Sequence, residues 1–175
     1  MEIFIEEAFR QAVLTEKKSS DFYRRAAARV RDGRGRQVLE QLANQETGHV
    51  EEILSLYSGA GLNNLLSLTE LPDDQNSPVF DGYPDEIDIQ MSEKNALGLA
   101  LRQEQSCMDR YEVFVATFRE PKVRKVFEQA LLMSRKHYQD LEERFRQVEA
   151  NSKLIAEMET FCWTASAHLT PPHRS

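Results

Sequence analysis

The feature that most constrains this chain is an internal repeat. A shift of 88 positions, made without a gap, superimposes one half of the sequence on the other. One shift serves two consecutive helical segments in each half, so we predict a duplicated helical hairpin. The period is too long, and the copies too few, for a solenoid. Matched pairs include Glu16 with Glu104, Tyr23 with Tyr111, His49 with His137, Ala12 with Ala100, and Val38 with Val126.

Hydrophobic residues recur at helical spacing in four long segments, which predicts an all-α fold. We predict a ferritin-like four-helix bundle over 1–151 and a shorter fifth helix and tail over 152–175. The fifth helix is expected to pack on the bundle or on a second subunit. The four bundle helices are expected at about 3–31, 37–57, 92–119 and 121–151, with a turn at 32–35, a crossover at about 58–91 and a helical turn or two at 62–68.

The crossover segment sets the predicted topology. Its many Gly and Pro residues end the helical pattern after Tyr57. More than thirty residues suffice to carry the chain from one end of a bundle to the other, as in bundles that contain one long crossover connection.

Polar residues interrupt the inner stripes of the predicted helices. Glu46 and His49 are three residues apart and therefore project from one face of a helix. A carboxylate and an imidazole so placed can both reach one metal ion in a bundle core. A lone pair of this kind also arises by chance, and mid-stripe histidines can be ordinary core residues. The repeat favours the interpretation of these residues as metal ligands, because Glu16, Glu104 and His137 fall in the middle of the other predicted helices.

One position breaks the pattern. Glu46 falls on Ser134, so the second copy keeps its histidine but loses its glutamate. Four carboxylates would balance two divalent irons, whereas three leave an excess positive charge. Three outcomes are open: two metals with hydroxide, water or another anion in the gap; one metal; or a vestigial site in which carboxylates pair with histidines. Unpaired buried charges are costly, which favours a cation or a proton there.

At these residues the sequence resembles the rubrerythrin branch of the ferritin-like superfamily, over about residues 3–149. The resemblance implies a homodimer or larger assembly with two irons that react with peroxide or oxygen. It also implies terminal carboxylates at Glu16 and Glu104, a bridging carboxylate at Glu46, and histidine ligands at His49 and His137. The family's further glutamate on the third helix corresponds to Cys107, and its rubredoxin domain is absent.

These features lead to a hypothesis about function. We expect an iron-binding protein, Fe²⁺/Fe³⁺ and dinuclear or else mononuclear, that reduces peroxide or oxygen or oxidises Fe(II). Tyr23 and Tyr111, each two turns beyond a predicted glutamate ligand, are candidate catalytic residues or plain core residues. Cys107 is expected to be a small core residue. The alternatives are a non-catalytic iron-storage protein and a metal-free structural bundle with a decayed site.

Composition excludes several other classes. The 175 residues suit one domain with a real core. A net charge of −7 argues against nucleic acid and against an anionic membrane as partner. No apolar run reaches the length of a membrane span, and the acidic N-terminus is unlike a signal peptide, so a cytoplasmic location is expected. The two cysteines form no Cys-x-x-Cys pair, so electrons would have to come from an external donor protein.

Overall fold

The computed structural model describes the backbone of residues 2–72 and 90–167, and the side chains of 5–72 and 90–158. Within these ranges the chain is all-helical, as the sequence predicts, and it contains no strand. None of the described helices is long and apolar enough to cross a membrane. The elements are α1 (Glu2–Arg29), α2 (Gly33–Ser55), α3 (Leu62–Ser67), the 3-10 turn η1 (Leu68–Glu70), α4 (Glu93–Thr117) and α5 (Pro121–Ala167).

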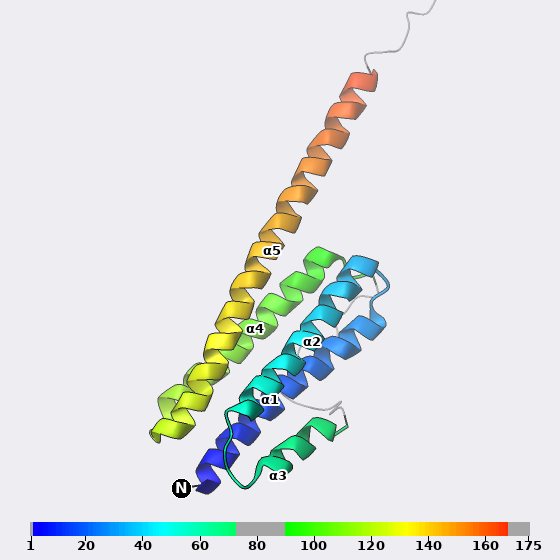
Figure 1. Ribbon diagram of the computed structural model, residues 1–175. Helices are drawn as coiled ribbons and strands as arrows, with labels where there is room; N and C mark the ends of the chain where they lie inside the picture. The colour runs from blue at the N-terminus through cyan, green and yellow to red at the C-terminus, as the bar shows by residue number, and fades with distance from the viewer. Residues whose placement is uncertain (1, 73–89, 168–175) are drawn as a thin grey trace, which may run out of the picture.

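The four long helices form two hairpins that lie side by side (Figure 1). α1 packs along α2, and α4 packs along α5. The hairpins then meet through α2 against α4 and α1 against α5, while short α3 lies beside α1. The predicted helical turns at 62–68 correspond to α3 and the start of η1. The remainder of the predicted crossover, 73–89, lies outside the described residues.

Local side-chain contacts set where the helices begin. Asp32 caps α2, since its Oδ1 accepts a hydrogen bond of 2.6 Å from the Gly35 amide. α2 therefore starts at Gly33, inside the segment that the sequence analysis assigned to a turn. Ser92 caps α4, accepting a hydrogen bond of 3.3 Å from the Asn95 amide, so this helix begins where the sequence predicts. Pro121 opens α5, also as predicted.

The predicted break near residue 151 is wrong. α5 is one continuous helix of 47 residues, so the described part of the segment after residue 151 belongs to α5 and not to a separate helix. No Gly or Pro follows Pro121 before Pro171, so nothing in the backbone stops the helix. Ser152 does not act as a cap, because its hydroxyl donates to the Val148 carbonyl one turn earlier, at 2.9 Å.

The far part of α5 runs beyond the other helices (Figure 1). Leu154, Ile155 and Met158 are 56%, 57% and 59% exposed. Of the two expected packings, against the bundle or against a second subunit, the first is therefore wrong at least as far as Met158, and the second stays a prediction. Side chains beyond it lie outside the described residues.

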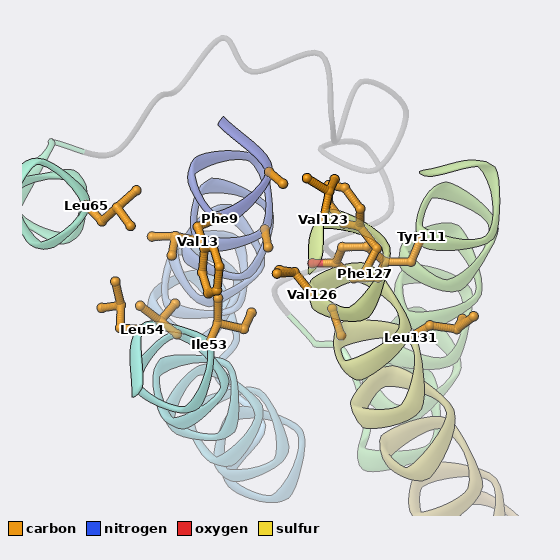
Figure 2. Close-up of a cluster of buried hydrophobic side chains, with 14 of the residues drawn as sticks. Phe9, Val13, Ile53, Leu54, Leu65, Tyr111, Val123, Val126, Phe127 and Leu131 are labelled. Atoms are coloured by element: carbon orange, nitrogen blue, oxygen red, sulfur yellow. The ribbon is translucent and has the colours of Figure 1, made fainter. Parts of the chain in front are cut away.

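The core consists of two hydrophobic clusters. We call them the Phe127 cluster and the Leu39 cluster. Figure 2 shows the first, in which Phe9 and Val13 of α1 face Ile53 of α2 while Phe127 of α5 lies beside Tyr111 of α4. The Leu39 cluster occupies the other half of the bundle; it contains Phe22, Tyr23, Ala26, Val30, Val38, Leu39, Leu42, Met91, Leu97, Leu99 and Leu141, with smaller alanines between.

Two glycines of α2 should respond oppositely to alanine. Gly48 is exposed mid-helix with nothing near its would-be Cβ, so Gly48→Ala should stabilise the protein by up to about 1 kcal/mol. A Cβ on Gly35 would overlap the backbone oxygen of Met91, so Gly35→Ala should cost about 1–3 kcal/mol. Urea unfolding of the two variants checks both signs. A Gly35→Ala variant as stable as the wild type would contradict the packing of α2 against Met91.

Candidate metal centre

A polar layer separates the two hydrophobic clusters. On each long helix the chain passes from one cluster to the other through a buried polar side chain. Glu16, Glu46 and Glu104 are each 2% exposed and His137 is 5% exposed, while the His49 side chain is 18% exposed. The structure thus brings together all five predicted metal ligands, from α1, α2, α4 and α5.

The glutamate on α2 faces both histidines. His49 Nδ1 lies 3.3 Å from Glu46 Oε2, and His137 Nδ1 lies 3.2 Å from Glu46 Oε1. The two imidazole rings are 5.6 Å apart between centroids, at nearly a right angle. Glu46, His49 and His137 offer ligand atoms that all lie within 4.8 Å of one another, so this group could hold a metal ion.

Each of the two histidines also lies beside a second carboxylate. His49 Nδ1 is also 3.3 Å from Glu16 Oε2, and His137 Nδ1 is also 3.2 Å from Glu104 Oε1. Each histidine therefore has one carboxylate of its own and shares Glu46 with the other histidine. The five side chains thus form two groups of three donors that share the Glu46 carboxylate: Glu16, Glu46 and His49 in one, and Glu104, Glu46 and His137 in the other.

The Glu46–His137 contact is not a hydrogen bond. Glu46 Oε1 and His137 Nδ1 are both buried, and although they lie 3.2 Å apart, neither has a hydrogen-bond partner. The other ring nitrogen, His137 Nε2, lies 2.8 Å from Gln45 Oε1. An amide oxygen only accepts, so Nε2 carries a proton. In the neutral ring, the Nδ1 lone pair then faces carboxylates, which is the arrangement of donors around a cation.

Gln45 is a residue that sequence reasoning missed. Its position next to Glu46 in the sequence does not indicate a role, because its contact with His137 depends on how α2 and α5 pack against each other. A side chain that orients a histidine by holding its second nitrogen is a usual companion of metal-binding histidines.

The two predicted tyrosines lie beside the carboxylates but differ in their contacts. The Tyr111 hydroxyl donates a hydrogen bond to Glu16 Oε1, from α4 to α1. The Tyr23 hydroxyl is completely buried and has no hydrogen-bond partner among the described residues. Burial, and next the charge of Glu104, raises the pKa of Tyr23 well above its usual value. Burial and the charge of Glu16 do the same to the pKa of Tyr111.

Cys107 fits the predicted role of a small core residue. It is 5% exposed, and its Sγ lies 3.7 Å from Ser19 Oγ and 3.7 Å from the Gln103 amide nitrogen. Burial, followed by the charge of Glu104, raises the pKa of the Cys107 thiol well above its usual value. The thiol is therefore protonated and is a poor metal ligand in this state.

Protons balance the cluster when no metal is bound. Burial lowers the pKa of His49, but Glu16 and Glu46 outweigh it and raise the value to about 10. Burial also opposes the charge on His137, and Glu104 and Glu46 likewise raise its pKa to about 10. Burial and the charge of Glu46 raise the pKa of Glu104 to about 7, against the opposing effect of His137. A metal ion would displace these protons.

Comparisons with models of protein families, with curated proteins and with solved structures find no match for this chain.

The metal-free protein should lose stability as the pH rises. The folded pKa values of His49 and His137 lie above the unfolded value of about 6.5, so their stabilisation is complete below that value and is lost towards about pH 10. Glu104 acts in the same direction between about pH 4.5 and 7, because its folded pKa is also raised. Urea unfolding of chelator-treated protein at pH 6, 7.5 and 9 should show falling midpoints. A His49→Gln/His137→Gln double variant should show little fall above pH 7; an equal fall there would contradict the assignment.

Removing the amide that holds His137 should weaken metal binding. Gln45→Ala should lower Co(II) affinity by about 10–100-fold, the usual effect of losing such an orienting partner. Asn44→Ala is the matched control, since Asn44 is the preceding exposed residue of α2. Titration with Co(II), followed by visible absorption, measures both variants. Equal affinity in the two would show that Gln45 does not position the ring.

Proposed function

We propose that this chain is a ferritin-like, rubrerythrin-like protein that binds two irons and acts as an oxidoreductase. Its reaction would be reduction of peroxide or oxygen, or oxidation of Fe(II). The observation that carries the proposal is Glu46, whose two oxygens face two different histidines at 3.3 and 3.2 Å. A carboxylate in that position is suited to bridge two metal ions.

The ligand assignment follows the two three-donor groups. Glu16 and His49 would hold one metal, Glu104 and His137 the other, and Glu46 both. Glu46 Oε1 and His137 Nδ1, which lie 3.2 Å apart without a hydrogen bond, fit this arrangement, because both are buried donor atoms that a cation would satisfy. Mixed carboxylate and imidazole donors suit iron, and two paired hairpins of long helices suit a ferritin-like bundle.

The chain's own residues would control protons and ligand orientation. If two ferrous ions were bound by these residues, the site would have available the two electrons that peroxide requires, with two protons, to become two waters. Tyr111 holds Glu16 in place through its hydrogen bond. Tyr23, whose buried hydroxyl has no hydrogen-bond partner among the described residues, is available as a hydrogen-bond donor on the other side.

Electrons would come from outside the chain. The two cysteines form no Cys-x-x-Cys pair for an iron centre of their own, so we propose an external donor protein. We further propose that the protein is a homodimer; the exposed apolar residues on the projecting part of α5 support a second subunit.

Two other functions remain as second candidates. Non-catalytic iron storage would use the same ligands without turnover. A metal-free structural bundle is favoured by one observation: the two histidines and Glu104 can hold protons that offset the buried carboxylates. Loss of the carboxylate at Ser134 favours it as well.

Metal content separates these functions. Full-length protein reloaded anaerobically with Fe(II) should contain about two irons per chain by elemental analysis, since two donor groups are present. A His49→Ala/His137→Ala variant should lose them, whereas the control His168→Ala/His173→Ala, which removes the other two histidines of the chain, should not. Peroxide-dependent oxidation of the bound Fe(II) then distinguishes the enzyme from a storage protein.

The alternative stoichiometries are informative. About one iron per chain would indicate the mononuclear site formed by Glu46, His49 and His137. No iron, in a protein whose unfolding is indifferent to metal, would overturn the proposal in favour of a structural bundle.

A further inference from the structure

Arginines are concentrated around the turn that joins α1 to α2. Residues 24–36 contain one aspartate, no lysine and six arginines: Arg24, Arg25, Arg29, Arg31, Arg34 and Arg36. Six positive charges against one negative charge give this segment a net charge of +5, whereas the whole chain carries −7. The end of the first hairpin is therefore a local basic surface on an otherwise acidic protein.

Three of these arginines have no counter-ion among the described residues. Arg29, Arg31 and Arg34 are exposed, and none of them forms an ion pair with the part of the chain that the structure describes. Their guanidinium groups are therefore available to an anionic partner from outside the chain.

The acidic side chains near this surface already have other contacts. Asp32 caps α2, and Asp21 pairs with Lys17 on its own helix. Glu40 lies 3.9 Å from Arg36, in an exposed pair one turn apart. Neutralisation of the three free arginines is thus left to a partner.

Helix stability does not explain the arginine at the start of α2. α2 begins at Gly33, so Arg34 lies in its first turn, and that turn contains no acidic residue. The N-terminal end of a helix carries partial positive charge, which favours an acidic residue there and disfavours a cation. Arg29 differs, because the last turn of α1 favours a positive charge. Arg34 stands against the preference of its helix, and an anionic partner gives it a role.

A hollow between α1 and α2 adjoins the same surface. Its volume is about 470 Å³, and its lining combines Arg24, Arg36 and Glu40 with three alanines and an asparagine. The Arg24 guanidinium donates a hydrogen bond of 2.9 Å to Thr47 Oγ1, which holds it across the two helices. Alanines between two guanidinium groups suit the methylene groups and the carboxylate of an acidic side chain.

We propose that this end of the first hairpin is a docking surface for an acidic protein, whose carboxylates pair with Arg29, Arg31 and Arg34. Arginine binds a carboxylate through two parallel hydrogen bonds, and the segment uses arginine alone. A nucleic acid fits less well, because its phosphates would continue from this small surface over the acidic remainder of the chain.

The shape of the molecule supports a protein as the partner. The projecting part of α5 leaves the bundle at the same end as the α1–α2 turn (Figure 1). Its exposed Leu154, Ile155 and Met158 thus offer apolar contacts at the end where the arginines offer charged ones. The surface involves none of the predicted metal ligands, so the inference does not depend on the proposed function.

A fluorescein-labelled peptide of about ten glutamates tests the proposal, by anisotropy with the full chain at low salt. The wild type should bind the peptide, and its affinity should fall as salt rises, because exposed charges are screened. Arg29→Gln/Arg31→Gln/Arg34→Gln should weaken binding about tenfold, since three exposed ion pairs of modest strength are lost.

The matched control is Lys122→Gln/Lys125→Gln/Lys136→Gln, which removes the same charge from exposed residues of α5. It should bind the peptide nearly as the wild type does. An equal loss of affinity in the two triple variants, or no binding by the wild type, overturns the inference.

Two further outcomes would assign the surface to another partner and overturn the inference as well. The first is tighter binding of an oligothymidylate of equal charge, lost in the arginine variant, which would indicate a nucleic-acid site. The second is self-association of the wild type at low salt in sedimentation, lost in the same variant, which would indicate a second copy of the chain. Either result leaves the proposed metal centre standing.

Urea unfolding separates docking from folding. Arg34→Glu places an acidic residue in the first turn of α2, so its urea midpoint should equal or exceed that of the wild type while peptide binding is weakened. A lowered midpoint would show that Arg34 serves the fold and would remove it from the docking surface.

Discussion

Three carboxylates buried at one level of a helical bundle impose the main constraint on this protein. Glu16, Glu46 and Glu104 come from three different helices, and each is almost fully shielded from water. Such charges are tolerated only when positive charge or protons lie beside them. The hydrophobic clusters above and below can form only if this layer is neutralised, so the centre and the core depend on each other.

The polar layer also joins the two hairpins. Glu16 and His49 belong to the first hairpin, and Glu104 and His137 to the second. The contacts that cross between them include those of Tyr111 with Glu16, His137 with Gln45, and His137 with Glu46. Hydrophobic contacts hold the helices together, but these pairs are directional. They determine how far one hairpin slides along the other, and therefore the separation of the two three-donor groups.

Much of this arrangement could be predicted from the sequence because it follows from helical periodicity. The repeat predicted that five side chains lie near the middle of their helices, and the structure brings them together: Glu16, Glu46, His49, Glu104 and His137. Partners across helices could not be predicted, because a choice such as Gln45 for His137 depends on helix rotation and docking. The start of α2 at Gly33 and the continuity of α5 past Ser152 were also missed. In both places a residue typical of turns is accommodated in a helix by a neighbour: Asp32 caps the one, and the Val148 carbonyl accepts from the other.

The unbroken course of α5 has a mechanical consequence. A helix advances by about 1.5 Å per residue and turns by a fixed angle, so Met158 lies about 30 Å along the axis from His137, at a set rotation. Because no hinge separates the projecting segment from the layer of buried ligands, the direction of its exposed apolar side chains is fixed relative to His137. A protein that binds this segment would therefore be held at a defined distance and orientation relative to His137, too far away to contact the histidine. The projecting part of α5 is therefore a rigid extension whose direction is fixed relative to the buried ligands of the bundle.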